Sequence, residues 1–189
     1  MTSIPSITVT DHVIQLYTAY RHTTDNDAKG LFFAVDCRQI CRPIPSYAAQ
    51  DRVTIVRYLH ESSGLSIDGS AVKEEKAKKS FATIRPLRPD EYEFGMDEQV
   101  KPAGFATADD LKKYALEQGW IGMRVDLWDE EEGELTADGQ PQGTLIKVQY
   151  WYGKEQKEDG TADWIQVLHD IMYIGQLDGT QGKEGELIE

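Results

Sequence analysis

The stretch Leu145-Ile146-Lys147-Val148-Gln149-Tyr150-Trp151-Tyr152 alternates apolar and polar or aromatic side chains along its length. A period of two predicts a β-strand with one face toward a core. Two neighbouring stretches, Trp120–Trp128 and Trp164–Ile174, also predict strands. The links between the three, Glu130–Gly143 and Gly153–Asp163, are polar and contain glycine, as antiparallel hairpin loops do. The second half of the chain therefore predicts consecutive antiparallel strands.

The first half predicts helices. After Thr10, a candidate N-cap, apolar residues recur at helical spacing, which indicates a helix that ends near residues 23–27. We expect further helices over Ala28–Val35, Ala49–Glu61 and Thr107–Gln118, and extended segments over Asp36–Ile44 and Phe81–Leu87. Helices followed by hairpin-linked strands are typical of the α+β class, with one curved antiparallel sheet covered by helices.

Composition narrows the class of function. The 189 residues suit one domain, and no apolar run approaches the ~18 residues of a membrane span. The net charge of −13 disfavours nucleic acid and anionic membranes as partners. The acidic excess lies in residues 90–189, notably at Asp129–Glu134, for which we expect a solvated loop, with an acidic docking surface as the alternative. Because no secretory signal opens the chain, we expect a cytoplasmic protein.

The sequence predicts no metal site and no cofactor. Cys37 and Cys41, if they lie on one strand, have Cα atoms about 13 Å apart, too far for a disulfide. Two thiols are also too few for a structural zinc site without histidine partners at the usual spacing. The chain has no glycine-rich phosphate loop, serine nucleophile elbow or His-Glu-x-x-His motif.

Two stretches carry a resemblance to a known group. Leu31-Phe32-Phe33-Ala34-Val35-Asp36, followed by Pro45 and a helix over residues 51–59, is one; Trp164 with His169-Asp170-Ile171-Met172-Tyr173 is the other. Together with the order of elements over residues 8–175, they resemble the nuclear-transport-factor-2-like, or SnoaL-like, superfamily. The resemblance implies three N-terminal helices packed on a strongly curved, mixed but mainly antiparallel sheet that forms a cone-shaped pocket. It also implies a homodimer, and we expect residues 176–189 to form a flexible acidic tail.

The triplet Arg124-Val125-Asp126 is a candidate for acid–base catalysis. On a strand, Arg124 and Asp126 share one face, where burial is costly unless the two charges pair. The triplet resembles the Arg-x-Asp strand of limonene epoxide hydrolase, whose second aspartate falls near Asp170 here. The resemblance implies that Asp126 and Asp170 form an acid–base pair oriented by Arg124. A structural salt bridge at a strand end is the alternative.

His169 and Asp170 are neighbours, so a regular strand directs them to opposite faces. We expect Asp170 to enter the pocket, because its face is mixed in character and includes Gln166 and Met172. If His169 enters instead, it becomes the natural general base.

Other residues are candidates for substrate binding. Tyr17 falls near the helix-one tyrosine of ketosteroid isomerase, an oxyanion donor, although a core role is the alternative. Scytalone dehydratase, another member of the superfamily, needs two pocket histidines, which His60 and His169 could supply only if both face inward; a helix-end role is the alternative for His60. The remaining candidates are Trp128, Tyr150 and Met172, of which the aromatic pair suits a flat apolar ligand. A dimer interface on the outer face of the sheet is the competing use of the aromatic residues in the last strands, and Trp151 is the first candidate for it.

Two hypotheses follow. The first is a cofactor-independent acid–base enzyme that acts on a small apolar secondary metabolite by isomerisation, cyclisation, dehydration or epoxide opening, as the resemblance to polyketide cyclases and fungal isomerases implies. The second is a non-catalytic module that binds a ligand or a protein, which predicts a filled or shallow cone and an exposed apolar patch.

Overall fold

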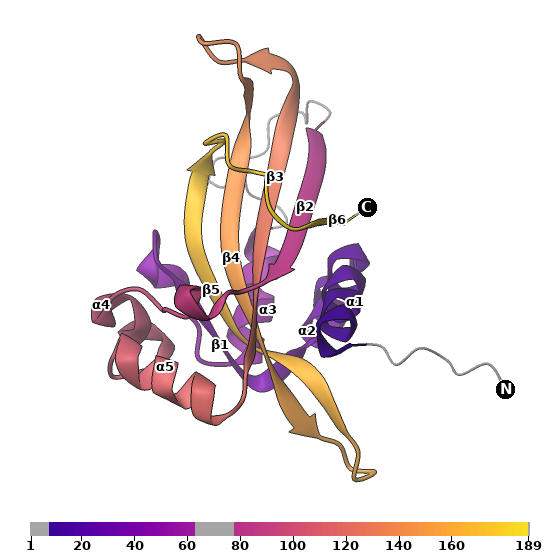
Figure 1. Cartoon of the computed structure of the whole chain (residues 1–189), viewed down its shortest axis with the longest axis vertical. Helices are drawn as coiled ribbons and strands as arrows, with labels where there is room; N and C mark the ends of the chain where they lie inside the picture. The colour runs from indigo at the N-terminus through magenta and orange to yellow at the C-terminus, as the bar shows by residue number, and fades with distance from the viewer. Residues whose placement is uncertain (1–7, 63–77, 189) are drawn as a thin grey trace, which may run out of the picture.

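A computed structural model describes residues 8–62 and 78–188. Six strands form one curved sheet in the order β1-β5-β4-β3-β2-β6 (Figure 1). Their bounds are β1 Phe33–Cys41, β2 Lys78–Pro86, β3 Ile121–Leu135, β4 Pro141–Gln156, β5 Ala162–Gln176 and β6 Glu186–Ile188. β1 pairs with β5 in parallel, and every other pair is antiparallel, so the sheet is mixed. The α+β class and the curved, mainly antiparallel sheet are confirmed.

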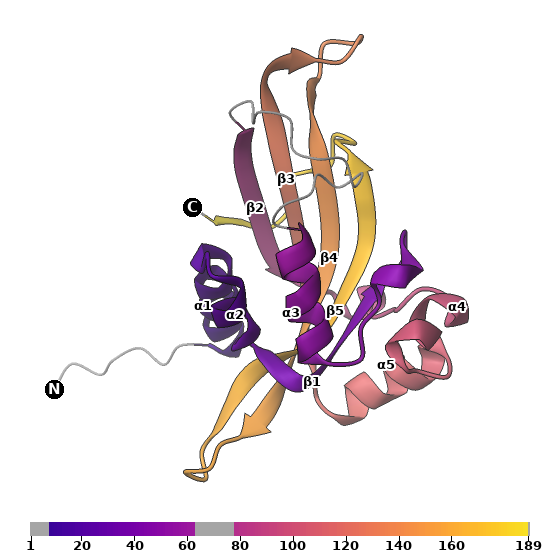
Figure 2. The same cartoon turned by 180° about the vertical axis from the view of Figure 1, so that it is seen from behind.

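Three helices cover the concave face of the sheet, with α3 lying across it (Figure 2). They are α1 Val9–His22, α2 Asn26–Gly30 and α3 Arg52–Ser62. The cap of α1 is Thr8 rather than the expected Thr10, because the side chain of Thr8 accepts a hydrogen bond from the Asp11 amide at 3.1 Å.

A second helical layer lies between β2 and β3 in the sequence and packs on the outer face of the sheet. It contains α4 Asp97–Val100, α5 Ala108–Glu117 and the 3₁₀ turns η2 Pro89–Glu91 and η3 Lys101–Ala103; a third turn, η1 Pro45–Tyr47, follows β1. Thr107 caps α5 as expected, since its side chain accepts from the Asp110 amide.

Two expectations about local structure were wrong. Helix α2 ends at Gly30, and the chain enters β1 at Phe33, because pairing with Gln166 of β5 draws Phe33 into the sheet. Residues 129–134 form no loop but continue β3. Backbone pairing of Asp129 with Thr144 does not depend on side-chain polarity, and Lys79 lies opposite Glu130, which offsets part of the acidic charge.

The C-terminal residues, expected to form a flexible tail, return to the sheet. After β5, the chain crosses the outer face and ends as β6 against β2 (Figure 1). Lys147 donates hydrogen bonds to Asp178 and Thr180 at 2.7 Å each, and Arg85 contacts Glu184 at 3.0 Å. Strand pairing and these ion pairs attach the segment to the body of the sheet.

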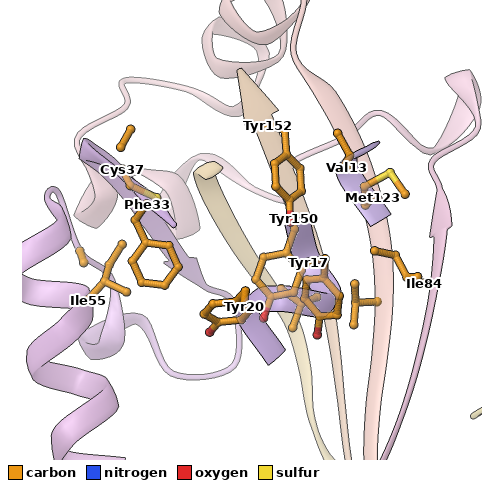
Figure 3. Close-up of a cluster of buried hydrophobic side chains, with 14 residues drawn as sticks. Val13, Tyr17, Tyr20, Phe33, Cys37, Ile55, Ile84, Met123, Tyr150 and Tyr152 are labelled. Atoms are coloured by element: carbon orange, nitrogen blue, oxygen red, sulfur yellow. The ribbon is translucent and has the colours of Figure 1, made fainter. Parts of the chain in front are cut away.

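The sheet separates two hydrophobic cores. The inner core joins α1, α3 and the concave face, and its larger members are labelled in Figure 3. The outer core packs α4 and α5 against Ile40, Trp151 and Leu168. Trp151 is fully buried there, with its ring centroid 5.0 Å from that of Tyr92 and 4.9 Å from that of Phe94. Trp151 is therefore wrong as a candidate for a dimer interface, because the segment of the same chain between β2 and β3 covers it.

Truncation of Trp151 should test the outer core. We expect Trp151→Ala to lower the free energy of unfolding by about 3–5 kcal/mol, because the substitution leaves a large cavity under α4 and η2. Leu135→Ala, at a residue that is 61% exposed, should change it by less than about 0.5 kcal/mol. Urea denaturation of both variants measures the difference. Similar small losses in the two variants would contradict a large contribution of outer-core packing to the free energy of unfolding.

Candidate functional site

A cavity of about 300 Å³ lies on the concave face, between α3, η1 and the inner sides of the central strands. Most of its walls are apolar. Inward-pointing residues of the neighbouring strands β1, β5, β4 and β3 supply many of them, because side chains along a strand point to opposite faces. The lining residues are Tyr20, Gln39, Cys41, Ile44, Tyr47, Ile55, Tyr58, Leu59, Glu61, Ser62, Leu127, Ile146, Val148, Tyr150, His169, Ile171 and Ile174.

His169 faces this cavity and Asp170 does not. His169 lies between Gln39 of β1 and Tyr150 of β4 in the strand register, whereas Asp170 lies between Ile40 and Gln149 on the outer face. The expectation that Asp170 enters the pocket was wrong, and its stated alternative, His169, takes that place. His169 and Asp170 do lie on opposite faces, and the packing of α1–α3 decides which face becomes concave. The alternation does not hold along all of β5: its register against β4 shifts on both sides of this pair, and Gln166, expected on the face of Asp170, contacts His169 instead.

The ring of His169 is held on several sides. It meets the rings of Phe33 and Tyr150 edge-on, at centroid distances of 4.7 and 4.8 Å. Its Nε2 forms a buried hydrogen bond with Oε1 of Gln166. An amide oxygen only accepts, so Nε2 carries the proton and Nδ1 keeps its lone pair. Burial lowers the pKa of His169 to about 3, so the ring is neutral at pH 7.

Tyrosine hydroxyls accompany His169. Tyr150 packs between Tyr17 and Tyr20 of α1, with ring centroids 5.1 and 6.2 Å away (Figure 3). Burial raises the pKa of all three phenols well above the ordinary value, so they remain protonated hydrogen-bond donors. Tyr150 lines the cavity as expected, and so does Tyr20. Tyr17 lies in the core behind them, which matches its alternative reading.

Asp170 has a structural setting. It is fully buried on the outer side of β5, and Arg42 donates to its two carboxylate oxygens, from Nη2 at 2.6 Å and from Nε at 3.0 Å. Burial raises the pKa of Asp170, while the Arg42 hydrogen bonds act in the opposite direction. Arg42 also contacts Glu93 at 2.9 Å. The pair thus ties β5 to the chain just after β1 and to the segment that covers the outer core.

Arg124 and Asp126 are brought together, but outside the cavity. Nε of Arg124 donates to Oδ1 of Asp126 at 3.0 Å, and the two side chains are only 20% and 15% exposed. Nη1 of Arg124 contacts the sulfur of Met172 at 3.6 Å. These groups border an outer-face depression that the C-terminal segment also lines, with Thr180 and Glu184. The geometry matches the structural salt bridge, the alternative to a catalytic pair.

The other candidate residues also lie away from the cavity. The side chain of His60 is 53% exposed and contacts Asp27 at 2.9 Å. Trp128 stacks on Phe81 on the outer face, with centroids 5.3 Å apart. Sequence reasoning missed Gln39 and Tyr20. Tyr20 could have been found, since it follows Tyr17 by three residues on the same helix face, but Gln39 gave no signal before β1 was placed.

Within residues 8–62 and 78–188, no group of three or more histidine, cysteine or carboxylate side chains is arranged to hold a metal ion. None of the helices in this part of the chain has the length and apolar character that crossing a membrane requires.

The two ion pairs should differ in their contribution to stability. We expect Arg42→Met to lower the free energy of unfolding by about 3–5 kcal/mol, because it leaves the buried Asp170 carboxylate without a partner. The matched change Arg124→Met, at a partly exposed pair, should cost less than about 1 kcal/mol. Chemical denaturation at neutral pH measures both, and equal losses would contradict a special role for Arg42.

His169 should make stability depend on pH. Its pKa is about 3 in the folded chain against an ordinary 6.5, so between these values the unfolded chain binds more protons. Lowering the pH from 6.5 toward 3 should therefore cost about 1.4 kcal/mol per pH unit through this residue, with no contribution above 6.5.

Removal of the imidazole isolates this contribution. We expect His169→Phe to lose less stability than wild type as the pH falls, measured by urea denaturation across that range. Ile171→Val, a cavity residue with no ionisable group, should keep the wild-type slope. Identical slopes in wild type and His169→Phe would show that His169 titrates normally.

Comparison with known proteins agrees with this architecture. No curated protein and no solved structure matches the chain significantly. One family model, that of the SnoaL-like domain, matches residues 2–189. The helices on a curved, unclosed, mixed sheet and the cavity on its concave side fit that match. The chain belongs to the SnoaL-like domain family.

Proposed function

We propose that this protein binds a small apolar molecule in the concave cavity. The observation that carries the proposal is a cavity of about 300 Å³ with mainly apolar walls, whose lining also includes the polar side chains of His169 and Tyr150. Apolar walls with a small number of placed polar groups are typical of ligand sites, and this volume is at the lower end of their range. A ligand of one or two rings suits it.

Three features support the proposal. The walls belong to strands and to α3 rather than to long loops, so the cavity is held by a rigid scaffold. Residues of the inner core such as Ile55, Val148 and Tyr150 form part of the walls, so the core packing holds the cavity lining in place. Membership of the SnoaL-like family agrees with a ligand-binding or isomerase- or cyclase-type fold.

Filling the cavity with a side chain tests the proposal. Naphthalene is the probe, and saturation-transfer NMR detects its binding. We expect Ile146→Trp, at a half-buried lining residue, to weaken naphthalene binding at least about tenfold, because the indole occupies the same space.

Leu135→Trp, on the exposed part of β3, is the matched control and should bind naphthalene as wild type does. Absence of binding to wild type, or equal binding by the two tryptophan variants, would refute a ligand site at this cavity.

Proton transfer on the bound molecule is the second candidate function. One observation favours it: the lone pair of His169 Nδ1 and the Tyr150 hydroxyl, a base and a donor, serve the same cavity. Against it, a pKa of about 3 makes the imidazole a weak base at neutral pH. Binding is therefore the function that the geometry supports better.

A two-ring ketone can separate binding from catalysis. If His169 is a general base, the protein should accelerate hydrogen–deuterium exchange next to the carbonyl of 2-tetralone in D₂O, and His169→Phe should reduce that rate about 10²–10⁴-fold. One-dimensional NMR follows the exchange. Wild-type protein that binds the ketone without acceleration would leave binding as the function.

Homodimerisation and a cytoplasmic location stay predictions of the family resemblance and the sequence.

A further inference from the structure

The polar groups around the cavity are mostly engaged within the protein. Nε2 of Gln39 donates to the backbone oxygen of Tyr47 at 2.8 Å. The Tyr58 hydroxyl contacts the backbone oxygens of Ser46 and Ala48 at 3.3 and 3.2 Å. These contacts hold η1 against β1 and α3, and they leave Tyr58 to present its ring, packed edge-on with Tyr47, to the cavity.

In the described part of the chain, His169 Nδ1 is an acceptor without such a partner. The Gln166 amide oxygen occupies Nε2, and no hydrogen bond to Nδ1 is found among the residues described. His169 is 4% exposed and lines the cavity, so a ligand in the cavity can reach the ring. A ligand with a hydrogen-bond donor would satisfy this acceptor in a site with few water molecules to compete for it.

Gln166 is itself fixed in position. It is almost fully buried and lies opposite Tyr152 of β4 in the register. Its amide nitrogen and the Tyr152 hydroxyl are both buried and have no hydrogen-bond partner within residues 8–62 and 78–188, so Gln166 is held by burial and by its contact with His169. The amide oxygen accepts from Nε2 of His169, and the imidazole cannot exchange its tautomer without breaking this hydrogen bond.

The charges around the cavity favour an uncharged ligand. Among the described lining residues no lysine or arginine occurs, and the one charged side chain is Glu61, near the end of α3. The Cys41 thiol, whose pKa burial raises, stays protonated. A carboxylate or phosphate ligand would thus lose its hydration with no cation to replace it.

We propose that the ligand class of this cavity is an uncharged ring compound with a hydroxyl group that donates a hydrogen bond to Nδ1 of His169. This inference rests on the proposed function and specifies it. The rings lie against the aliphatic and aromatic walls, and the hydroxyl lies at His169. Gln166 is the positioning residue, because it keeps Nδ1 an acceptor.

Three naphthalene derivatives of similar size test the proposal: 2-naphthol, which is an uncharged donor; 2-methoxynaphthalene, which has no donor; and 2-naphthoate, an anion. Dissociation constants are measured at pH 7 by calorimetry or NMR titration. We expect 2-naphthol to bind about five- to tenfold more tightly than 2-methoxynaphthalene, and 2-naphthoate to bind at least about 100-fold more weakly than 2-naphthol.

Substitution assigns the preference to His169. In His169→Phe, which keeps a ring between Phe33 and Tyr150, 2-naphthol and 2-methoxynaphthalene should bind equally. Leu135→Ala, at an exposed residue outside the cavity, should keep the preference. A second measurement needs no variant: ¹⁵N spectra of the four histidine rings should show one Nε2-protonated ring whose Nδ1 signal moves with 2-naphthol and not with 2-methoxynaphthalene.

The outcomes separate this inference from the proposed function. Equal binding of 2-naphthol and 2-methoxynaphthalene to wild type, or tight binding of 2-naphthoate, would overturn the ligand class while the cavity remains a binding site. A preference that persists in His169→Phe would overturn the assignment to His169. No binding of any of the three compounds, nor of naphthalene, would refute the binding function itself.

Discussion

Both faces of the central strands β4 and β5 are buried, and the rest of the structure depends on this constraint. A sheet that packs on one side only would leave Trp151 and Leu168 in water. Here the first three helices cover the concave face, and the segment between β2 and β3 covers part of the outer face. The two cores are separate, so the concave side is free to keep a cavity without loss of the outer packing.

The same constraint explains how the chain distributes its ionisable groups. The neighbouring residues His169 and Asp170 of β5 are buried on opposite faces of the sheet, and the cost of burying each is offset in a different way. Asp170 is buried as one half of a bidentate ion pair with Arg42, which supplies the countercharge and the hydrogen bonds that a carboxylate needs. His169 is buried as a neutral ring, held by Gln166. The charged pair therefore contributes to architecture, whereas the neutral group faces the cavity and is available to a ligand.

Much of the fold could be predicted from local pattern. The alternation over residues 145–152 and the apolar spacing around Val13 and Tyr17 report burial directly, because strand and helix periodicities differ. Predictions failed where pairing overrode propensity. Phe33 and Asp129 lie in segments with helical or loop-like composition, yet each enters a strand because its backbone finds a partner, Gln166 or Thr144, distant in sequence. The alternation of side chains along β4 did not reveal that the segment between β2 and β3 covers Trp151.

The sequence by itself determined the class of the fold, the family and the fact that His169 and Asp170 point to opposite faces, since these follow from periodicity, element order and the two-residue repeat of a strand. Only the tertiary structure decided which of the two faces the cavity. That choice depends on where α1 and α3 pack and on which arginine reaches Asp170: Arg42, 128 residues away in the chain, rather than Arg124. Contacts of that separation have no local signal, because they arise from the register of distant strands.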